Sequence, residues 1–145
     1  MPALLSDMLR DRPSVSHIVR WLLTTVTAAY VAVLLWTTHA PRVPQPQVHL
    51  GRIPPDKLLH FSAYAVLGML AAMTTHAWGR IGLRMLLTLF AMLAAFAAAD
   101  EVTQPLFGRA AEATDWVADV AGIAVALAVW AGCRQVTRRL RMTAG

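Results

Sequence analysis

The sequence predicts an all-α integral membrane protein, a single bundle of four transmembrane helices with both termini in the cytoplasm. Composition gives the first reason, because 57% of the 145 residues are hydrophobic and only 14% are charged. Soluble domains carry about 25% charged residues, and the mean hydropathy of this chain is +0.52. The apolar residues also fall into four stretches, each close to the ~20 residues that a helix needs to cross the hydrocarbon core of a bilayer.

The predicted helices belong to one domain, residues 1–145, and span residues 18–38, 57–78, 83–104 and 115–133. The first is too long an apolar run for a signal peptide and has no small-residue cleavage site after it, so we expect it to stay in the protein. Five prolines between residues 40 and 55 exclude a helix there and predict an extended loop. The last two apolar runs are short, and their polar ends should extend them into the membrane interface.

The distribution of Lys and Arg predicts the orientation of the bundle. Nine arginines lie in the N-terminal segment, the second connection and the C-terminal segment, whereas only four basic residues flank the other side. Because Lys and Arg are enriched in cytoplasmic segments, both termini are expected in the cytoplasm. The five tryptophans lie near the predicted helix ends, where aromatic anchors of membrane helices occur.

The residue counts argue against nucleic-acid binding and against sites built from cysteine. The formal net charge is +5, but the arginines are spread along the flanks of apolar segments and form no contiguous basic stripe, so nucleic acid is not an expected partner. The single Cys133 excludes an internal disulfide and a cysteine-based zinc site. The pattern does not predict an oligomeric state.

Ionisable residues gather at one end of three predicted helices, which the topology brings to the same extracytoplasmic face. A charge inside a membrane costs several kcal/mol unless it is paired or reaches water, so such residues are retained for a reason. Lys57, His60 and Tyr64 share one stripe at i, i+3, i+7 spacing, with Asp56 one turn below His60. The second helix therefore carries a polar seam at its outer end.

The third and fourth helices carry matching polar ends. Asp100 and Gln104 are four residues apart, with Glu101 turned aside by about 100°, and Asp115 and Asp119 repeat the spacing of four. Asp115 also fits the N-cap of its helix, but Asp119 lies a turn deeper, where capping does not explain it. The candidate ligand-binding residues are Lys57, His60, Tyr64, Asp100, Glu101, Gln104, Arg109, Asp115 and Asp119.

Small residues predict where two helices approach closely. Ala118, Gly122 and Ala126 form a small-xxx-small strip on the fourth helix, which permits close helix contact. The alanine-rich stretch at residues 94–99 offers a matching surface, so we expect the third helix to pack there.

Three segments resemble the VanZ-like family: DKLLHFSAY at residues 56–64, DEVTQPLFGR at residues 100–109 and DWVADVAG at residues 115–122. The resemblance covers the last three helices and both outer loops. It implies a small multi-pass protein of the bacterial cytoplasmic membrane that acts in the cell envelope. The family is named after a member linked to resistance to the glycopeptide teicoplanin, and the resistance-linked branch is expected to carry Asn where this chain has Asp119.

The polar end most favours a binding site for an anionic envelope lipid or lipid-linked precursor. In this hypothesis Lys57, His60 and Arg109 hold the head group, while apolar helix faces hold the tail. The protein would then bind membrane lipids and this ligand, and no cofactor.

Two further functions stay open, beside a purely structural ion-pair network. An intramembrane hydrolase or transferase would use His60 as general acid or base, with one acid among Asp100, Glu101 and Asp119 as its partner. Lys57 or Arg109 would stabilise the developing negative charge. A non-enzymatic assembly or transport protein would use the seam to dock a partner. Ser62 points off the polar stripe, so covalent catalysis is not predicted.

The histidines give little support for a metal site. Only one histidine lies among the carboxylates, and zinc sites usually have more nitrogen or sulfur ligands, so no metal is predicted. The others lie in loops or at helix flanks and receive no predicted role: His17, His39, His49 and His76.

Overall fold

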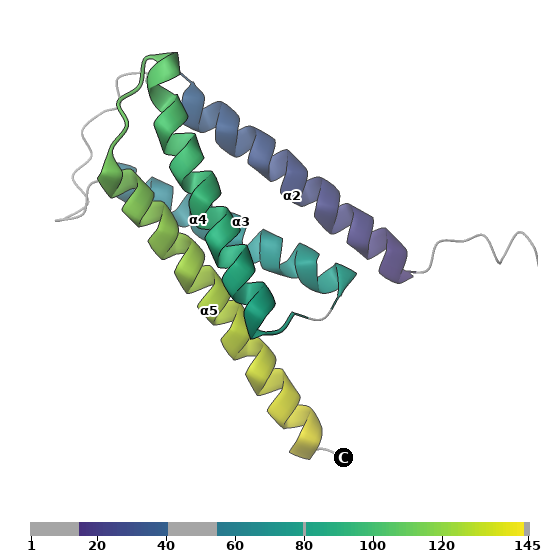
Figure 1. Ribbon diagram of the computed structural model, residues 1–145. Helices are drawn as coiled ribbons and strands as arrows, with labels where there is room; N and C mark the ends of the chain where they lie inside the picture. The colour runs from purple at the N-terminus through teal and green to yellow at the C-terminus, as the bar shows by residue number, and fades with distance from the viewer. Residues whose placement is uncertain (1–14, 41–54, 80, 144–145) are drawn as a thin grey trace, which may run out of the picture.

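The computed structural model describes residues 15–40, 55–79 and 81–143, and within these ranges it contains helices and no strand (Figure 1). The elements are α2 (Val15–His39), α3 (Pro55–Trp78), α4 (Leu83–Thr103), the short 3₁₀ helix η1 (Gln104–Phe107) and α5 (Ala113–Thr143). Within the described ranges, four segments are long and apolar enough to cross a membrane: His17–His39, Pro55–Trp78, Leu83–Phe107 and Ala113–Thr137. The predicted all-α bundle with four membrane-spanning helices is therefore confirmed.

The helix ends differ from the prediction where polar residues continue a helix. The last helix was predicted to end at Cys133, but α5 continues to Thr143, because the polar segment that follows contains no Gly or Pro and is rich in Arg, a good helix former. In Figure 1 this yellow end extends beyond the other helices. The third helix tightens into η1 and ends at Gly108, whose φ of 74° suits glycine. The predicted proline-rich loop and His49 lie outside the described residues.

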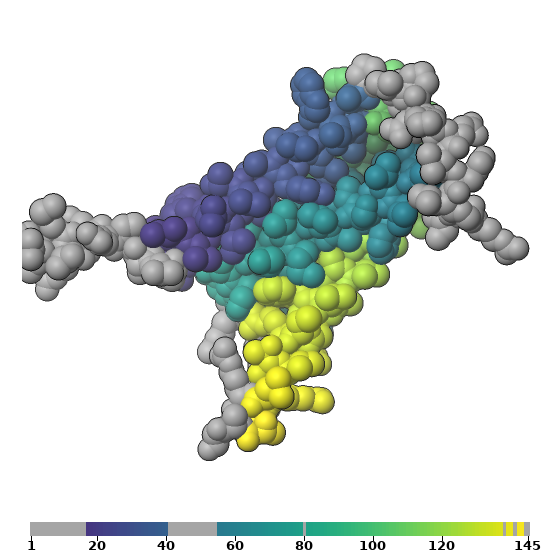
Figure 2. All heavy atoms as spheres, turned by 180° about the vertical axis from the view of Figure 1, so that it is seen from behind, coloured from purple at the N-terminus to yellow at the C-terminus, as the bar shows by residue number. Residues whose placement is uncertain are grey.

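The core forms around α3, which packs against α5 and α2, while α4 packs mainly on α5. Figure 2 shows α2 and α3 side by side, with α5 along the other flank of α3. The buried core residues come from all four helices: Leu34, Tyr64, Leu67, Ala72, Ala97, Ile123 and Leu127. Every helix keeps many large apolar side chains exposed on its outer face, as expected for a surface that meets lipid.

The closest helix approach is between α5 and α3, not between α5 and the alanine-rich α4 that we expected. A Cβ added to Gly122 would overlap the carbonyl oxygen of Phe61 and lie 3.0 Å from the amide nitrogen of Ala65. On the facing helix, a Cβ at Gly68 would lie 3.2 Å from Cβ of Ala126. Since α3 has its own small residues opposite the strip, the two backbones meet there.

This contact predicts a large difference between two glycines of one helix. Gly122→Ala should lower the free energy of unfolding by about 1–3 kcal/mol, because the added methyl group forces α5 away from α3. Gly132→Ala is the matched control, since a Cβ there meets no atom within 4 Å. The measurement is thermal unfolding in detergent, followed by tryptophan fluorescence. Equal midpoints for the two variants would contradict the close approach.

Candidate functional site

All the acidic residues in the described ranges lie at one end of the bundle, where α2 and α4 end and α3 and α5 begin (Figure 1). They are Asp56, Asp100, Glu101, Glu112, Asp115 and Asp119. Four of them are buried: Asp100, Glu101, Asp115 and Asp119. Carboxylates buried at this density need cations, hydrogen-bond donors or a ligand to stabilise them.

Lys57 lies at the centre of the first group of contacts. Its ammonium is 2.7 Å from Oε2 of Glu112 and 3.8 Å from Oδ2 of Asp56, and it also bonds Oδ1 of Asp115. Asp115 is fully buried and points into the bundle from the first turn of α5. Its carboxylate is therefore an ion-pair partner of Lys57. Glu112 was not among the predicted site residues, because it lies in the connection before α5, where helical spacing does not mark it.

His60 lies between two buried carboxylates of α5. Its Nδ1 is 3.0 Å from Oδ1 of Asp119, and its Nε2 is 3.6 Å from Oδ2 of Asp115. When Asp119 is ionised its carboxylate only accepts hydrogen bonds, and Nδ1 is then the ring nitrogen that donates to it. The imidazole is thus held in one orientation, with Nε2 turned toward Asp115.

Asp100 accepts two hydrogen bonds from neighbouring helices. The hydroxyl of Thr38 donates to Oδ1 at 2.9 Å, and the hydroxyl of Tyr64 donates to Oδ2 at 2.8 Å. His39, which was given no role, lies 3.4 Å from the same carboxylate through Nδ1 and 3.0 Å from Oγ1 of Thr103 through Nε2. Helical spacing does not predict this contact, because it depends on how α2 lies against α4.

Glu101 and Gln104 hold the connection between η1 and α5. Oε1 of Glu101 accepts the backbone N–H of Glu112, and Oε2 accepts a hydrogen bond of 3.2 Å from Nε2 of Gln104. The acid in contact with His60 is Asp119 rather than Glu101. Glu101 instead fixes the loop that precedes Asp115.

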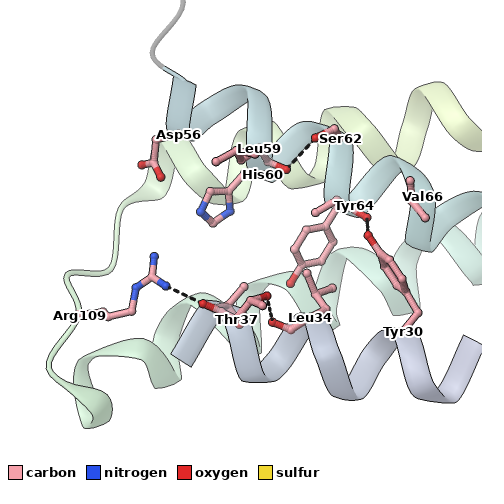
Figure 3. Close-up of a pocket in the computed structure, with 12 residues that line it drawn as sticks. Tyr30, Leu34, Thr37, Asp56, Leu59, His60, Ser62, Tyr64, Val66 and Arg109 are labelled. Carbon is pink, nitrogen blue, oxygen red and sulfur yellow. Dashed lines mark hydrogen bonds between the residues drawn. The ribbon is translucent and has the colours of Figure 1, made fainter. Parts of the chain in front are cut away.

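A cavity of about 480 Å³ opens beside these groups, between α2 and α3. Figure 3 shows His60, Asp56 and Arg109 at one end of it and Tyr30, Leu34 and Val66 at the other. Arg109 donates from NH1 to the carbonyl oxygen of Thr37 at 3.2 Å. The cavity therefore has a charged end and a largely apolar end.

Several buried polar atoms at this end have no hydrogen-bond partner among the described residues. They are Gln104 Oε1, Arg109 Nε, Asp115 Oδ2 and Asp119 Oδ2. A buried polar group without a partner costs about 1–3 kcal/mol. A ligand, an ion or a water molecule can supply the missing partners.

The comparisons with known proteins give one family. A family model described as VanZ/LLP1 matches residues 12–134, a range that contains every residue of the polar end. No curated protein and no solved structure matches the chain significantly.

Proposed function

Since this chain belongs to the VanZ/LLP1 family and has four membrane-spanning helices, we propose that it binds the anionic head group of an envelope lipid, or of a lipid-linked precursor, in the cavity between α2 and α3. The observation that carries the proposal is the division of this cavity into a charged end and an apolar end. Its volume of about 480 Å³ falls within the range of about 300–1,000 Å³ that is usual for ligand pockets.

Arg109 supplies the positive charge for a phosphate. Its guanidinium points into the cavity, NH1 donates to a backbone carbonyl oxygen, and Nε has no hydrogen-bond partner among the described residues. Guanidinium groups bind phosphate through paired N–H donors. His60 lies across the cavity from Arg109, and its ring can bind the phosphate once Nε2 also carries a proton, because only an N–H donates to a phosphate oxygen (Figure 3).

Lys57 was predicted from the sequence to hold the head group, but its contacts favour another role. Its ammonium contacts Asp56, Glu112 and Asp115. We therefore assign it to holding Asp115 in position rather than to the head group. Leu34, Leu59 and Val66 line the cavity and supply an apolar surface for the first methylene groups of a lipid tail.

A second function, an intramembrane hydrolase or transferase, is favoured by one observation. The pair formed by His60 and Asp119 has the geometry of a general base oriented by a carboxylate. Ser62 is exposed and donates to the carbonyl oxygen of Leu59, so the nucleophile in this alternative is water. Turnover of the bound lipid would distinguish this enzyme from a binding protein.

Native mass spectrometry of the purified protein tests lipid binding. Wild type should retain a phosphate-containing lipid from the membrane, and Arg109→Gln should lower the bound fraction at least tenfold. Arg84→Gln is the matched control, because Arg84 is exposed at the start of α4, away from the cavity. Equal lipid occupancy in all three proteins would overturn the proposal.

The predicted orientation places this cavity on the extracytoplasmic side of the bacterial cytoplasmic membrane. A reporter fused after Gly145 and one inserted at Gly79 should both report the cytoplasm, and one inserted near Gln47 should report the outside. This follows from the nine arginines on one side against four basic residues on the other. A cysteine introduced near Gln47 is expected to react with a membrane-impermeant reagent added from outside. If it does not react, the orientation is wrong.

A further inference from the structure

We propose that Asp56, His60 and Asp115 bind a divalent first-row transition metal ion, with Asp119 as the residue that positions His60. The three residues lie at the charged end of the bundle, and each has one ligand atom within 4.8 Å of the others. Metal binding itself does not depend on lipid binding.

The distance between the ligand atoms of His60 and Asp115 fits coordination of a first-row transition metal ion. Ligand atoms at 2.0–2.2 Å from a tetrahedral metal ion lie about 3.4 Å from one another. His60 Nε2 and Asp115 Oδ2 are 3.6 Å apart, so this pair already has the required spacing. Asp56 lies one helical turn before His60 on the same face, and its partly exposed side chain can close the remaining distance by a change of rotamer.

His60 has the orientation of a metal ligand. Histidines that bind metals usually donate their second ring N–H to a carboxylate, which fixes the tautomer and directs the free nitrogen at the metal. Asp119 accepts the Nδ1 hydrogen bond at 3.0 Å, and the other nitrogen is the one that faces Asp115. The single histidine among the carboxylates did not predict a metal, because the contact of His60 with Asp119 depends on the packing of α3 against α5.

Asp115 gives the second, independent observation. It is fully buried, Lys57 bonds its Oδ1, and its Oδ2 has no hydrogen-bond donor among the described residues. Lys57 therefore directs the unpartnered oxygen toward Nε2 of His60. A cation between the two atoms would satisfy that oxygen.

The local charge also favours a cation. Among the described residues, Asp56, Glu112 and Asp115 contact Lys57 and Asp119 contacts His60, so carboxylate oxygens gather around the ligand atoms. A donor set of one imidazole and carboxylates suits Zn²⁺, Fe²⁺ or Mn²⁺ better than Mg²⁺ or Ca²⁺, which prefer oxygen alone.

The metal would face the cavity, since Asp56 and His60 both line it. An ion bound there takes the place of a proton on Nε2 and brings more positive charge to the head-group site. This last step rests on the proposed function, and the metal measurement is made on lipid-free protein so that the two proposals can fail separately.

The test uses full-length, chelator-treated protein in detergent, to which Zn²⁺ is added before dialysis and elemental analysis. Wild type should bind one equivalent, and His60→Ala should bind at least ten times more weakly. Asp119→Asn should weaken binding by about 10–100-fold, as loss of a carboxylate behind a ligating histidine does. The control is His76→Ala, at the opposite end of α3, which should bind like wild type.

X-ray absorption of the Zn²⁺-loaded wild type keeps the test decisive if His60→Ala does not fold. The expected spectrum contains one imidazole and otherwise oxygen ligands. Three results would overturn the proposal: no stoichiometric ion in wild type, a spectrum without imidazole, or undiminished binding by folded His60→Ala.

Discussion

Asp100→Ala is expected to lower the free energy of unfolding by about 2–5 kcal/mol, because it removes the common acceptor of two buried hydroxyl groups. Tyr64 is fully buried and donates to one oxygen of Asp100, and Thr38, which is also buried, donates to the other. Without the carboxylate, Tyr64 loses its acceptor, Thr38 is left with the longer bond of 3.2 Å to the carbonyl oxygen of Leu35, and α2, α3 and α4 lose the residue that joins them. Thermal unfolding in detergent measures the loss.

Tyr64→Phe provides the matched comparison for Asp100→Ala. It removes one donor but leaves Asp100 bound to Thr38, so a smaller loss of about 1 kcal/mol is expected. If Asp100→Ala were as stable as wild type, or no less stable than Tyr64→Phe, Asp100 would not be the residue that joins α2, α3 and α4.

Unlike Asp100→Ala, Asp119→Asn should leave the free energy of unfolding nearly unchanged. It should weaken the binding of lipid and of Zn²⁺ at least tenfold. The amide oxygen of Asn can accept the hydrogen bond that Nδ1 of His60 now donates to Asp119. The fold is therefore preserved, but the negative charge that supports a proton or a metal ion on Nε2 is lost. Thermal unfolding and native mass spectrometry, run on the same preparation, measure the two effects.

Asp119→Ala separates the charge from the hydrogen bond. It leaves the buried Nδ1–H without an acceptor, so it should lower both stability, by about 1–3 kcal/mol, and binding. An Asp119→Asn protein that fails to accumulate in the membrane, or that binds lipid and Zn²⁺ like wild type, would show that Asp119 acts only as a structural partner of His60.

The sequence was sufficient for the four membrane helices, because apolar length alone decides whether a helix can span a bilayer. It also placed Lys57, His60 and Tyr64 on one stripe, since helical spacing fixes which residues share a face. In the structure this stripe contacts the acids of α4 and α5. Lys57 pairs with Asp115, His60 contacts Asp119, and Tyr64 donates a hydrogen bond to Asp100.

The remaining features depend on tertiary contacts that periodicity does not encode. The alanine-rich stretch suggested that α4 faces Gly122, but small residues on α3 fit the same strip. His39 and Glu112 lie at a helix end and in a loop, where no periodic pattern marks them. Their contacts become visible only when the ends of the helices are placed relative to one another.

The most direct test of the central claim is photo-crosslinking with a phospholipid that carries a diazirine close to its head group. The cavity should concentrate the crosslinks on its lining residues in α2 and α3, such as Leu34 and Leu59, and Arg109→Gln should remove them. Leu87 and Met92 of α4 are exposed away from the cavity and report ordinary contact with lipid. Crosslinks spread evenly over the exposed helix faces, and unchanged by Arg109→Gln, would contradict a head-group site between α2 and α3.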